Sequence, residues 1–319
     1  MLARVPRISP RTYAVITLIA LATLVIIVFT GAAVRLTGSG LGCPTWPRCE
    51  GKIIQTQLSS HAAIEYGNRL FTGVVSIATI AAALAAFLRK PFRADLAILG
   101  ILLPLGVVGQ AVLGGLTVIY GLAPGFVMAH FLLSQLVLAA AVALAWRARY
   151  EPGERPRVAD RLSVLPVRAL LVWGGLVLFA GTAATGAGPH AGASGTGELV
   201  PRLDFWGGTT MTDLIHWHGR MSTLLGVSAV LIWVLLWRRG ANADVRKAMT
   251  AVCLLIGAQG IVGFIQYENA LPPEVVWIHV ALATCTWVSL LWATAAAGTL
   301  TPAVEPGRQR AVSVERAGV

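Results

Sequence analysis

The chain contains Gly109-Gln-Ala-Val-Leu-Gly-Gly-Leu-Thr-Val-Ile-Tyr-Gly-Leu-Ala-Pro-Gly-Phe-Val-Met-Ala-His-Phe-Leu-Leu133, and a related stretch follows 149 residues later, from Ala258 to Leu282. Seven of these twenty-five positions are identical without a gap, and His130 and His279 are one of the identical pairs. Two shorter upstream pairs repeat as well: Phe29-Thr-Gly31 with Phe179-Ala-Gly181, and Thr37-Gly-Ser-Gly40 with Thr185-Gly-Ala-Gly188. Repetition at a nearly fixed period predicts a chain built from two similar halves.

The composition is that of a membrane protein. Hydrophobic residues make up 56% of the chain and charged residues 12%, and the mean hydropathy is +0.73. Apolar runs of about twenty residues are long enough to cross a bilayer core. Eight such runs are present, at about 12–33, 61–88, 95–119, 125–147, 167–187, 211–238, 246–267 and 274–297. The sequence therefore predicts an all-α membrane protein with eight transmembrane helices in two repeated four-helix bundles.

The positive charge is distributed as membrane topology requires. Of the 25 Lys and Arg residues, 19 lie near the N-terminus, in alternate connections between the helices, or in the C-terminal tail. This positive-inside bias places both termini in the cytoplasm. The net charge of +11 therefore reflects contact with anionic lipid, and it does not indicate binding to nucleic acid.

The predicted domain boundaries follow from this topology. Residues 1–147 form the N-terminal bundle, 148–166 a cytoplasmic linker, 167–297 the C-terminal bundle, and 298–319 a disordered cytoplasmic tail. Long external loops, 34–60 and 188–210, follow the first helix of each half. Cys43 and Cys49 lie in the first of these loops, on the oxidising side, where a disulfide is expected. The pair would be either a staple for the loop or a redox-active thiol pair.

The histidines suggest haem ligation. All six lie in the external half of the chain's membrane segments or in external loops, at positions 61, 130, 190, 216, 218 and 279. Ionisable groups inside a membrane usually face the bundle interior at functional sites. Two histidines on facing helices of a four-helix bundle can hold a haem through both axial positions. The sites would lie towards the extracytoplasmic side.

In the C-terminal half, the expected pair is His279 with either His216 or His218. These two histidines lie about 200° apart around a helix, so only one of them can face the ligand. Asp213-x-x-His216 repeats Glu65-x-x-Asn68 at an offset of 148 residues, the offset also seen in the Thr37/Thr185 pair. The shared offset of 148 residues favours His216 as the ligand.

Several motifs of the chain resemble those of a known family. Arg35-Leu-Thr-Gly-Ser-Gly-Leu-Gly-Cys-Pro-Thr-Trp-Pro-Arg-Cys49, Ile64-Glu-Tyr-Gly-Asn-Arg69, the Gly188-Pro-His-Ala-Gly192 turn and the two late histidines resemble haem A synthase, across all eight helices. The resemblance implies oxidation of the C8 methyl of haem O to a formyl group, which gives haem A for cytochrome oxidase. It also implies that haem O synthase and cytochrome oxidase assembly proteins are partners, and that this four-electron oxidation needs an external electron acceptor.

The resemblance also implies roles for individual residues. His216 and His279 would be the axial ligands of a haem b cofactor in the C-terminal half. His130 would bind the substrate haem in the N-terminal half, and Glu65 would be the acidic residue required for the chemistry. Glu65 has a second reading, as an ion-pair partner of Arg69 four residues along its own helix.

The chain departs from the family pattern at Asn68, where the family has a histidine. Either His130 alone holds the substrate iron and one face stays open, or His61 replaces the missing ligand. His61 shares a helical face with Glu65 and Asn68, but it is also placed as an ordinary residue at a helix start. Arg69 and Arg220 would pair with haem propionates, or would anchor their helices at the membrane interface.

Two other functions compete with the synthase. A di-haem electron-transfer cytochrome of the membrane requires two histidines in each half, and Asn68 argues against it. Repeated bundles also form transporters, and a transporter would carry no haem.

Overall fold

The structure is a computed structural model that describes residues 7–43, 45–49, 59–158, 160–190, 192–194 and 196–300. Its long helices are α1 (Pro10–Leu36), α2 (Ser60–Leu88), α3 (Ala94–Ile119), α4 (Pro124–Arg149), α5 (Leu165–Ala187), α6 (Thr210–Arg238), α7 (Ala243–Glu268) and α8 (Pro273–Ala296). All eight are long and apolar enough to cross a membrane, so the predicted number of spans is confirmed. Every helix end lies within three residues of its predicted position.

Local sequence signals explain where the helices begin. Ser9, Ser59 and Asn242 each accept a hydrogen bond from a backbone N–H of the first turn of α1, α2 and α7. Such caps satisfy donors that the helix leaves unpaired. Helices α4 and α8 instead begin at Pro124 and Pro273, because proline fits the first helical position, where no N–H is needed.

The turns before α4 and α8 have the same backbone conformation. Gly121 and Leu122 both have positive φ, at 55° and 58°, and Ala270 and Leu271 have φ of 57° and 62°. Positive φ is uncommon for residues other than glycine. The two halves therefore use the same unusual turn at positions related by the offset of 149 residues.

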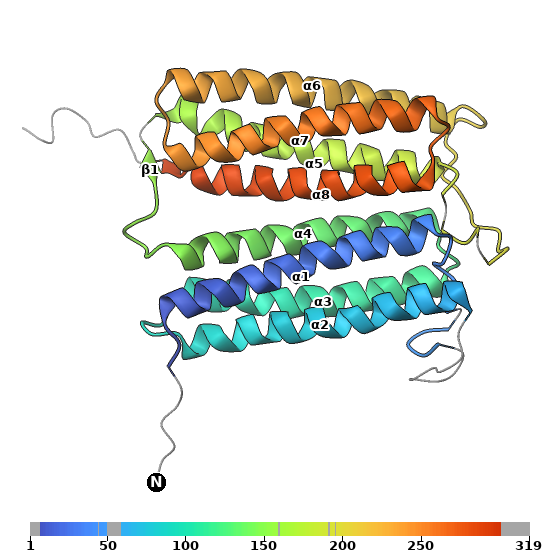
Figure 1. Cartoon of the computed structure of the whole chain (residues 1–319), viewed down its shortest axis with the longest axis horizontal. Helices are drawn as coiled ribbons and strands as arrows, with labels where there is room; N and C mark the ends of the chain where they lie inside the picture. The colour runs from blue at the N-terminus through green and yellow to red at the C-terminus, as the bar shows by residue number, and fades with distance from the viewer. Residues whose placement is uncertain are drawn as a thin grey trace, which may run out of the picture.

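The helices form two four-helix bundles, α1–α4 and α5–α8, which lie side by side (Figure 1). In the first, α2 and α4 each pack on α1 and α3, so α2 and α4 lie on a diagonal; α6 and α8 hold the same relation in the second. Each bundle has its own cluster of buried apolar side chains. The bundles meet where α8 packs on α1 and α4, and where α4 packs on α5.

At one end of the molecule, hereafter the basic end, the linker packs against the C-terminal bundle. It contains β1 (Arg157–Val158) and a short 3₁₀ helix, η1 (Arg161–Ser163). Strand β1 pairs in parallel with β2 (Thr299–Leu300), which follows α8. Hydrogen bonds from Arg239 lower the pKa of the Asp160 carboxyl to about 2. The tail predicted to be disordered begins at residue 298, but Thr299 and Leu300 form β2, so that boundary is wrong; the rest of the tail, from residue 301, lies outside the described residues.

At the opposite end, hereafter the loop end, the two long loops touch each other. The Gly40 N–H donates to the Gly192 carbonyl at 2.7 Å. The Arg35 guanidinium donates to the carbonyls of His190, at 2.9 Å, and Thr185, at 3.2 Å. We call these contacts among Arg35, Gly40, Thr185, His190 and Gly192 the loop junction. It joins the two bundles at the loop end.

Candidate functional site

His218 of α6 and His279 of α8 face each other across the C-terminal bundle. Their ring centroids are 6.3 Å apart and their planes meet at 74°. Two imidazoles that share one metal ion, each at an N–metal distance of about 2 Å with the ring centre about 1 Å behind the nitrogen, have ring centres about 6 Å apart. The separation therefore fits a metal held between the two rings, as in a haem with two axial histidines.

The hydrogen bond of the His218 ring agrees with that fit. His218 Nδ1 lies 3.2 Å from the Val177 carbonyl oxygen. A histidine whose Nδ1–H donates to a carbonyl presents Nε2 to a metal. His279 Nδ1 is buried and has no hydrogen-bond partner among the described residues.

Each of the paired rings packs against a glycine on a neighbouring helix. A Cβ added to Gly181 of α5 would lie 3.0 Å from His218 Cε1, and a Cβ added to Gly263 of α7 would lie 3.4 Å from His279 Cε1. The absence of a side chain lets each ring approach the helix backbone. These glycines are part of the sequence repeat, but the repeat alone predicts no role for them.

His216 does not face His279. It is exposed, and its Nε2 lies 3.4 Å from the Tyr267 hydroxyl. The offset of 148 residues predicts His216 as the partner of His279. The geometry instead favours His218 as that partner. The pair Phe29/Phe179 has an offset of 150 residues, and that offset maps Asn68 onto His218. The offset is 150 residues within α1 and α5 but 148 at Thr37 and Thr185, so the sequence alone allows both registers, and the histidine pair favours that of His218.

The N-terminal bundle repeats half of this arrangement. His130 of α4 packs on Gly114 of α3, where an added Cβ would lie 3.1 Å from its Cε1. His130 Nδ1 is buried without a partner among the described residues. On α2, the position equivalent to His218 is Asn68, whose Oδ1 accepts a hydrogen bond of 2.7 Å from the Thr30 hydroxyl.

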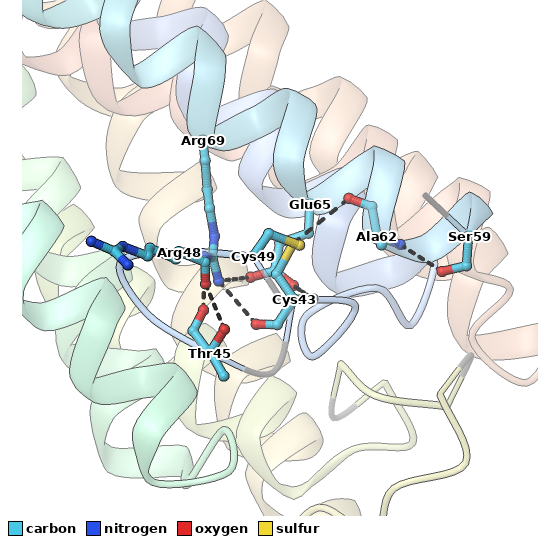
Figure 2. Close-up of a disulfide and its surroundings, with 8 residues drawn as sticks. All are labelled: Cys43, Thr45, Arg48, Cys49, Ser59, Ala62, Glu65 and Arg69. Carbon is cyan, nitrogen blue, oxygen red and sulfur yellow. Dashed lines mark hydrogen bonds and ion pairs between the residues drawn. A yellow bond between two sulfur atoms is a disulfide. The ribbon is translucent and has the colours of Figure 1, made fainter. Parts of the chain in front are cut away.

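Glu65 and Arg69 bind the loop that contains the disulfide, as Figure 2 shows. The Cys43–Cys49 disulfide is present, which confirms the predicted pair. Glu65 is 6% exposed, and its carboxylate accepts hydrogen bonds from the Cys43 N–H at 2.7 Å and from Arg69 at 2.5 Å. Arg69 also donates to the carbonyls of Cys43 and Thr45. The predicted Glu65–Arg69 pair therefore also anchors the loop on α2, a link that the sequence did not reveal.

The same loop covers α3. A Cβ added to Gly115 would lie 2.7 Å from the Trp46 ring, so the indole rests on the helix backbone. Trp46 lies between the two cysteines in sequence. The disulfide loop thus spans from α2 to α3 across the loop end of the N-terminal bundle.

The remaining candidate residues lie around these sites. His61 Nδ1 lies 2.9 Å from the Ser39 hydroxyl, so this ring contacts the first loop. His190 Nε2 lies 2.6 Å from the Leu271 carbonyl. Arg220 is exposed and stacks its guanidinium on Trp217, 5.5 Å from the ring centroid. Among the described residues, no group of three or more His, Cys, Asp or Glu side chains forms a metal site.

Comparison with known proteins identifies the family of the chain. The model of the family described as cytochrome oxidase assembly protein (COX15-CtaA) matches residues 14–195, which include the disulfide loop, Glu65 and His130. A protein named heme A synthase from Listeria monocytogenes serotype 4a is 25% identical over 299 residues, which are 89% of this chain and 92% of the relative.

Two further relatives match over shorter stretches. The heme A synthase of Alkalihalophilus pseudofirmus is 32% identical over 154 residues, which are 48% of this chain and 50% of the relative. That of Lysinibacillus sphaericus is 32% identical over 123 residues, which are 38% of this chain and 40% of the relative. The family model covers more than half of this chain, and the chain belongs to the cytochrome oxidase assembly protein family.

Proposed function

We propose that this protein is a haem A synthase, which oxidises the C8 methyl group of haem O to a formyl group. One observation supports this most strongly. A pair of histidines with haem-compatible spacing lies in one bundle, and a single buried histidine takes the equivalent place in the other. Such unequal sites suit one resident cofactor and one exchangeable substrate.

The C-terminal bundle holds the cofactor, haem b. His218 and His279 would hold its iron, and the Val177 carbonyl fixes the orientation of the His218 ring. When bound, haem b supplies a one-electron redox centre. Arg220 is exposed one turn beyond Trp217 on the same side of the membrane, where its guanidinium is available for a propionate.

The N-terminal bundle binds the substrate, haem O. His130 coordinates the substrate iron from α4, and its helix is tied to α3 because the Gln110 side chain donates to the His130 carbonyl at 3.1 Å. Asn68 stands where a second histidine ligand would be, and it does not coordinate the iron. His61 lies two helical turns, about 10 Å, from Asn68 on α2 and contacts the first loop through Ser39, so we assign it to the loop rather than to the iron.

Glu65 is the acidic residue of the substrate site. The Cys43 N–H and Arg69 hold its two carboxylate oxygens in place, so its orientation depends on the disulfide loop. A carboxylate held in this way can accept or relay a proton near the reacting group. The Arg69 guanidinium donates hydrogen bonds to Glu65 and to loop carbonyls. It therefore stabilises the loop rather than binding a haem propionate.

The protein spans the cell membrane with its basic end in the cytoplasm. The positive-inside rule places residues 147–168 and 238–247 on that side. Both haem sites then lie towards the extracytoplasmic side, where an external acceptor takes the electrons. Haem O synthase supplies the substrate, and cytochrome oxidase assembly consumes the product.

Expression in a host that makes haem O but lacks its own synthase tests this proposal. Extracted pigments should contain haem A, and the purified protein should show the spectrum of a low-spin haem. His130→Ala should abolish haem A while the low-spin haem stays. His216→Ala is a matched control in the other bundle and should change neither. Purified protein without a Soret band would contradict the proposal.

A further inference from the structure

The four haem-facing positions of the repeat are occupied by three histidines and one asparagine. His130 corresponds to His279 at an offset of 149 residues, and Asn68 corresponds to His218 at an offset of 150. The glycines on the neighbouring helices correspond too: Gly31 to Gly181 at 150 residues. Asn68 therefore stands where the cofactor site has its second ligand.

The Asn68 amide is held in one orientation. The Thr30 hydroxyl donates to Asn68 Oδ1 at 2.7 Å and lies 3.2 Å from the Ile27 carbonyl. A hydroxyl has one proton, so Thr30 donates it to the nearer acceptor, Asn68 Oδ1. With Oδ1 occupied by Thr30, the Nδ2 amino group is the free end of the side chain, and it has no hydrogen-bond partner among the described residues.

The site also has space beside Asn68. A Cβ added to Gly31 would have no heavy atom within 4 Å, whereas one added to Gly181 would lie 3.0 Å from the His218 ring. The shorter amide thus leaves open the place where an imidazole packs in the other bundle. An amide nitrogen is a poor metal ligand but a good hydrogen-bond donor.

We propose that Asn68, oriented by Thr30, donates a hydrogen bond to a water-sized ligand in the open axial position opposite His130. This inference rests on the proposed function, because it requires a haem in the N-terminal bundle. The ligand class is a small molecule with a lone pair, such as water in the resting protein. Asn68 is then a specificity-determining residue for what occupies that position.

Carbon monoxide is the probe for the test. Protein loaded with haem O and reduced should bind it only in the N-terminal bundle, since both axial positions of the low-spin haem b are filled. A donor near the bound molecule lowers its C–O stretching frequency. Asn68→Leu, which keeps the side-chain size, should raise that frequency and weaken carbon monoxide binding roughly threefold to tenfold, the effect of one lost hydrogen bond.

Two further variants locate the effect. Thr30→Val leaves Asn68 in place but removes its orienting hydroxyl, so the C–O band should broaden and shift partway towards that of Asn68→Leu. Asn68→His should fill the axial position, produce a second low-spin haem and abolish carbon monoxide binding. In the C-terminal bundle, the matched change His218→Asn should create a site that binds carbon monoxide.

The outcomes separate this inference from the proposed function. A C–O frequency that is the same in the unmodified protein, Asn68→Leu and Thr30→Val would overturn the role of Asn68 while leaving haem binding intact. If Asn68→Leu fails to take up haem O, the Thr30→Val comparison decides. Failure of the unmodified protein to bind haem O at all would overturn both.

Discussion

The Trp277 indole of α8 donates a hydrogen bond of 2.9 Å to the Phe29 carbonyl of α1, and the two rings meet edge to face with their centroids 6.5 Å apart. This contact joins the two bundles beside both proposed sites. Trp277 is two residues before His279, and Phe29 is next to Thr30, the partner of Asn68. The contact therefore ties the position of α8 to that of α1.

We predict that Trp277→Phe lowers the stability of the protein in detergent by about 1 kcal/mol, because it keeps a ring but removes the hydrogen bond. Trp277→Leu should lose roughly another 1 kcal/mol with the aromatic pair. Thermal unfolding followed by circular dichroism measures both. Trp217→Phe is the matched control, since Trp217 is exposed and stacks only on Arg220 among the described residues. Equal effects of the two Trp→Phe changes would contradict a specific role for the bundle contact.

His218→Ala should remove the low-spin haem b, and His216→Ala should keep it. The reason is that His218 faces His279, whereas His216 is exposed beside Tyr267. Haem stoichiometry and the reduced-minus-oxidised spectrum of purified protein measure the difference. Loss of haem in His216→Ala with retention in His218→Ala would restore the register given by the offset of 148 residues.

Gly181→Ala should weaken haem b binding roughly 10- to 100-fold, the usual cost of displacing a group that orients a metal ligand. Its new Cβ would press on the His218 ring. Gly31→Ala is the matched control from the repeat, since its Cβ would meet nothing within 4 Å, and it should leave substrate binding unchanged. Titration of haem into the apoprotein measures both. Similar affinities for the two variants would mean that ring packing on Gly181 is unimportant.

Glu65→Gln should leave the haem b spectrum intact, lower haem A production, and loosen the disulfide loop. It removes the charge from the hydrogen bond with Arg69, and such a buried bond contributes about 2 kcal/mol. The Cys43–Cys49 disulfide should then be reduced faster by dithiothreitol. Asp213→Asn, which neutralises the acidic residue in the first turn of α6, is the control and should have no effect on the loop. Normal haem A output with a loosened loop would assign Glu65 a structural role only.

The helices could be predicted from sequence because each is a long apolar run, and the repeat supplies the equivalence of His130 and His279. Their first residues are set by local features that the apolar runs do not show, such as the Ser59 cap and Pro124. The strand pair Arg157–Val158 with Thr299–Leu300 could not be predicted, since two-residue strands carry no periodic pattern.

The register of α6 was the weakest part of the sequence argument. The repeat offset is 150 residues at Phe29 and Phe179 but 148 at Thr37 and Thr185. The sequence alone therefore allows two registers, and the approach of His218 to His279 and to Gly181 distinguishes them. The anchoring of the disulfide loop by Glu65 was also invisible, because it depends on a loop folding back onto a helix 22 residues away in sequence. Contacts between distant segments are fixed by tertiary packing, not by local pattern.

The loop junction has a thermodynamic consequence. Because Gly40 bonds to Gly192 and Arg35 to His190, ordering the outer loop of one bundle also restricts the outer loop of the other. A molecule that enters one bundle and orders its loop reduces the conformational entropy that the second molecule must remove. By reciprocity, each must then raise the other's affinity by the same factor. The two bundles would then bind their ligands cooperatively, although neither bundle contributes a side chain to the other's binding site.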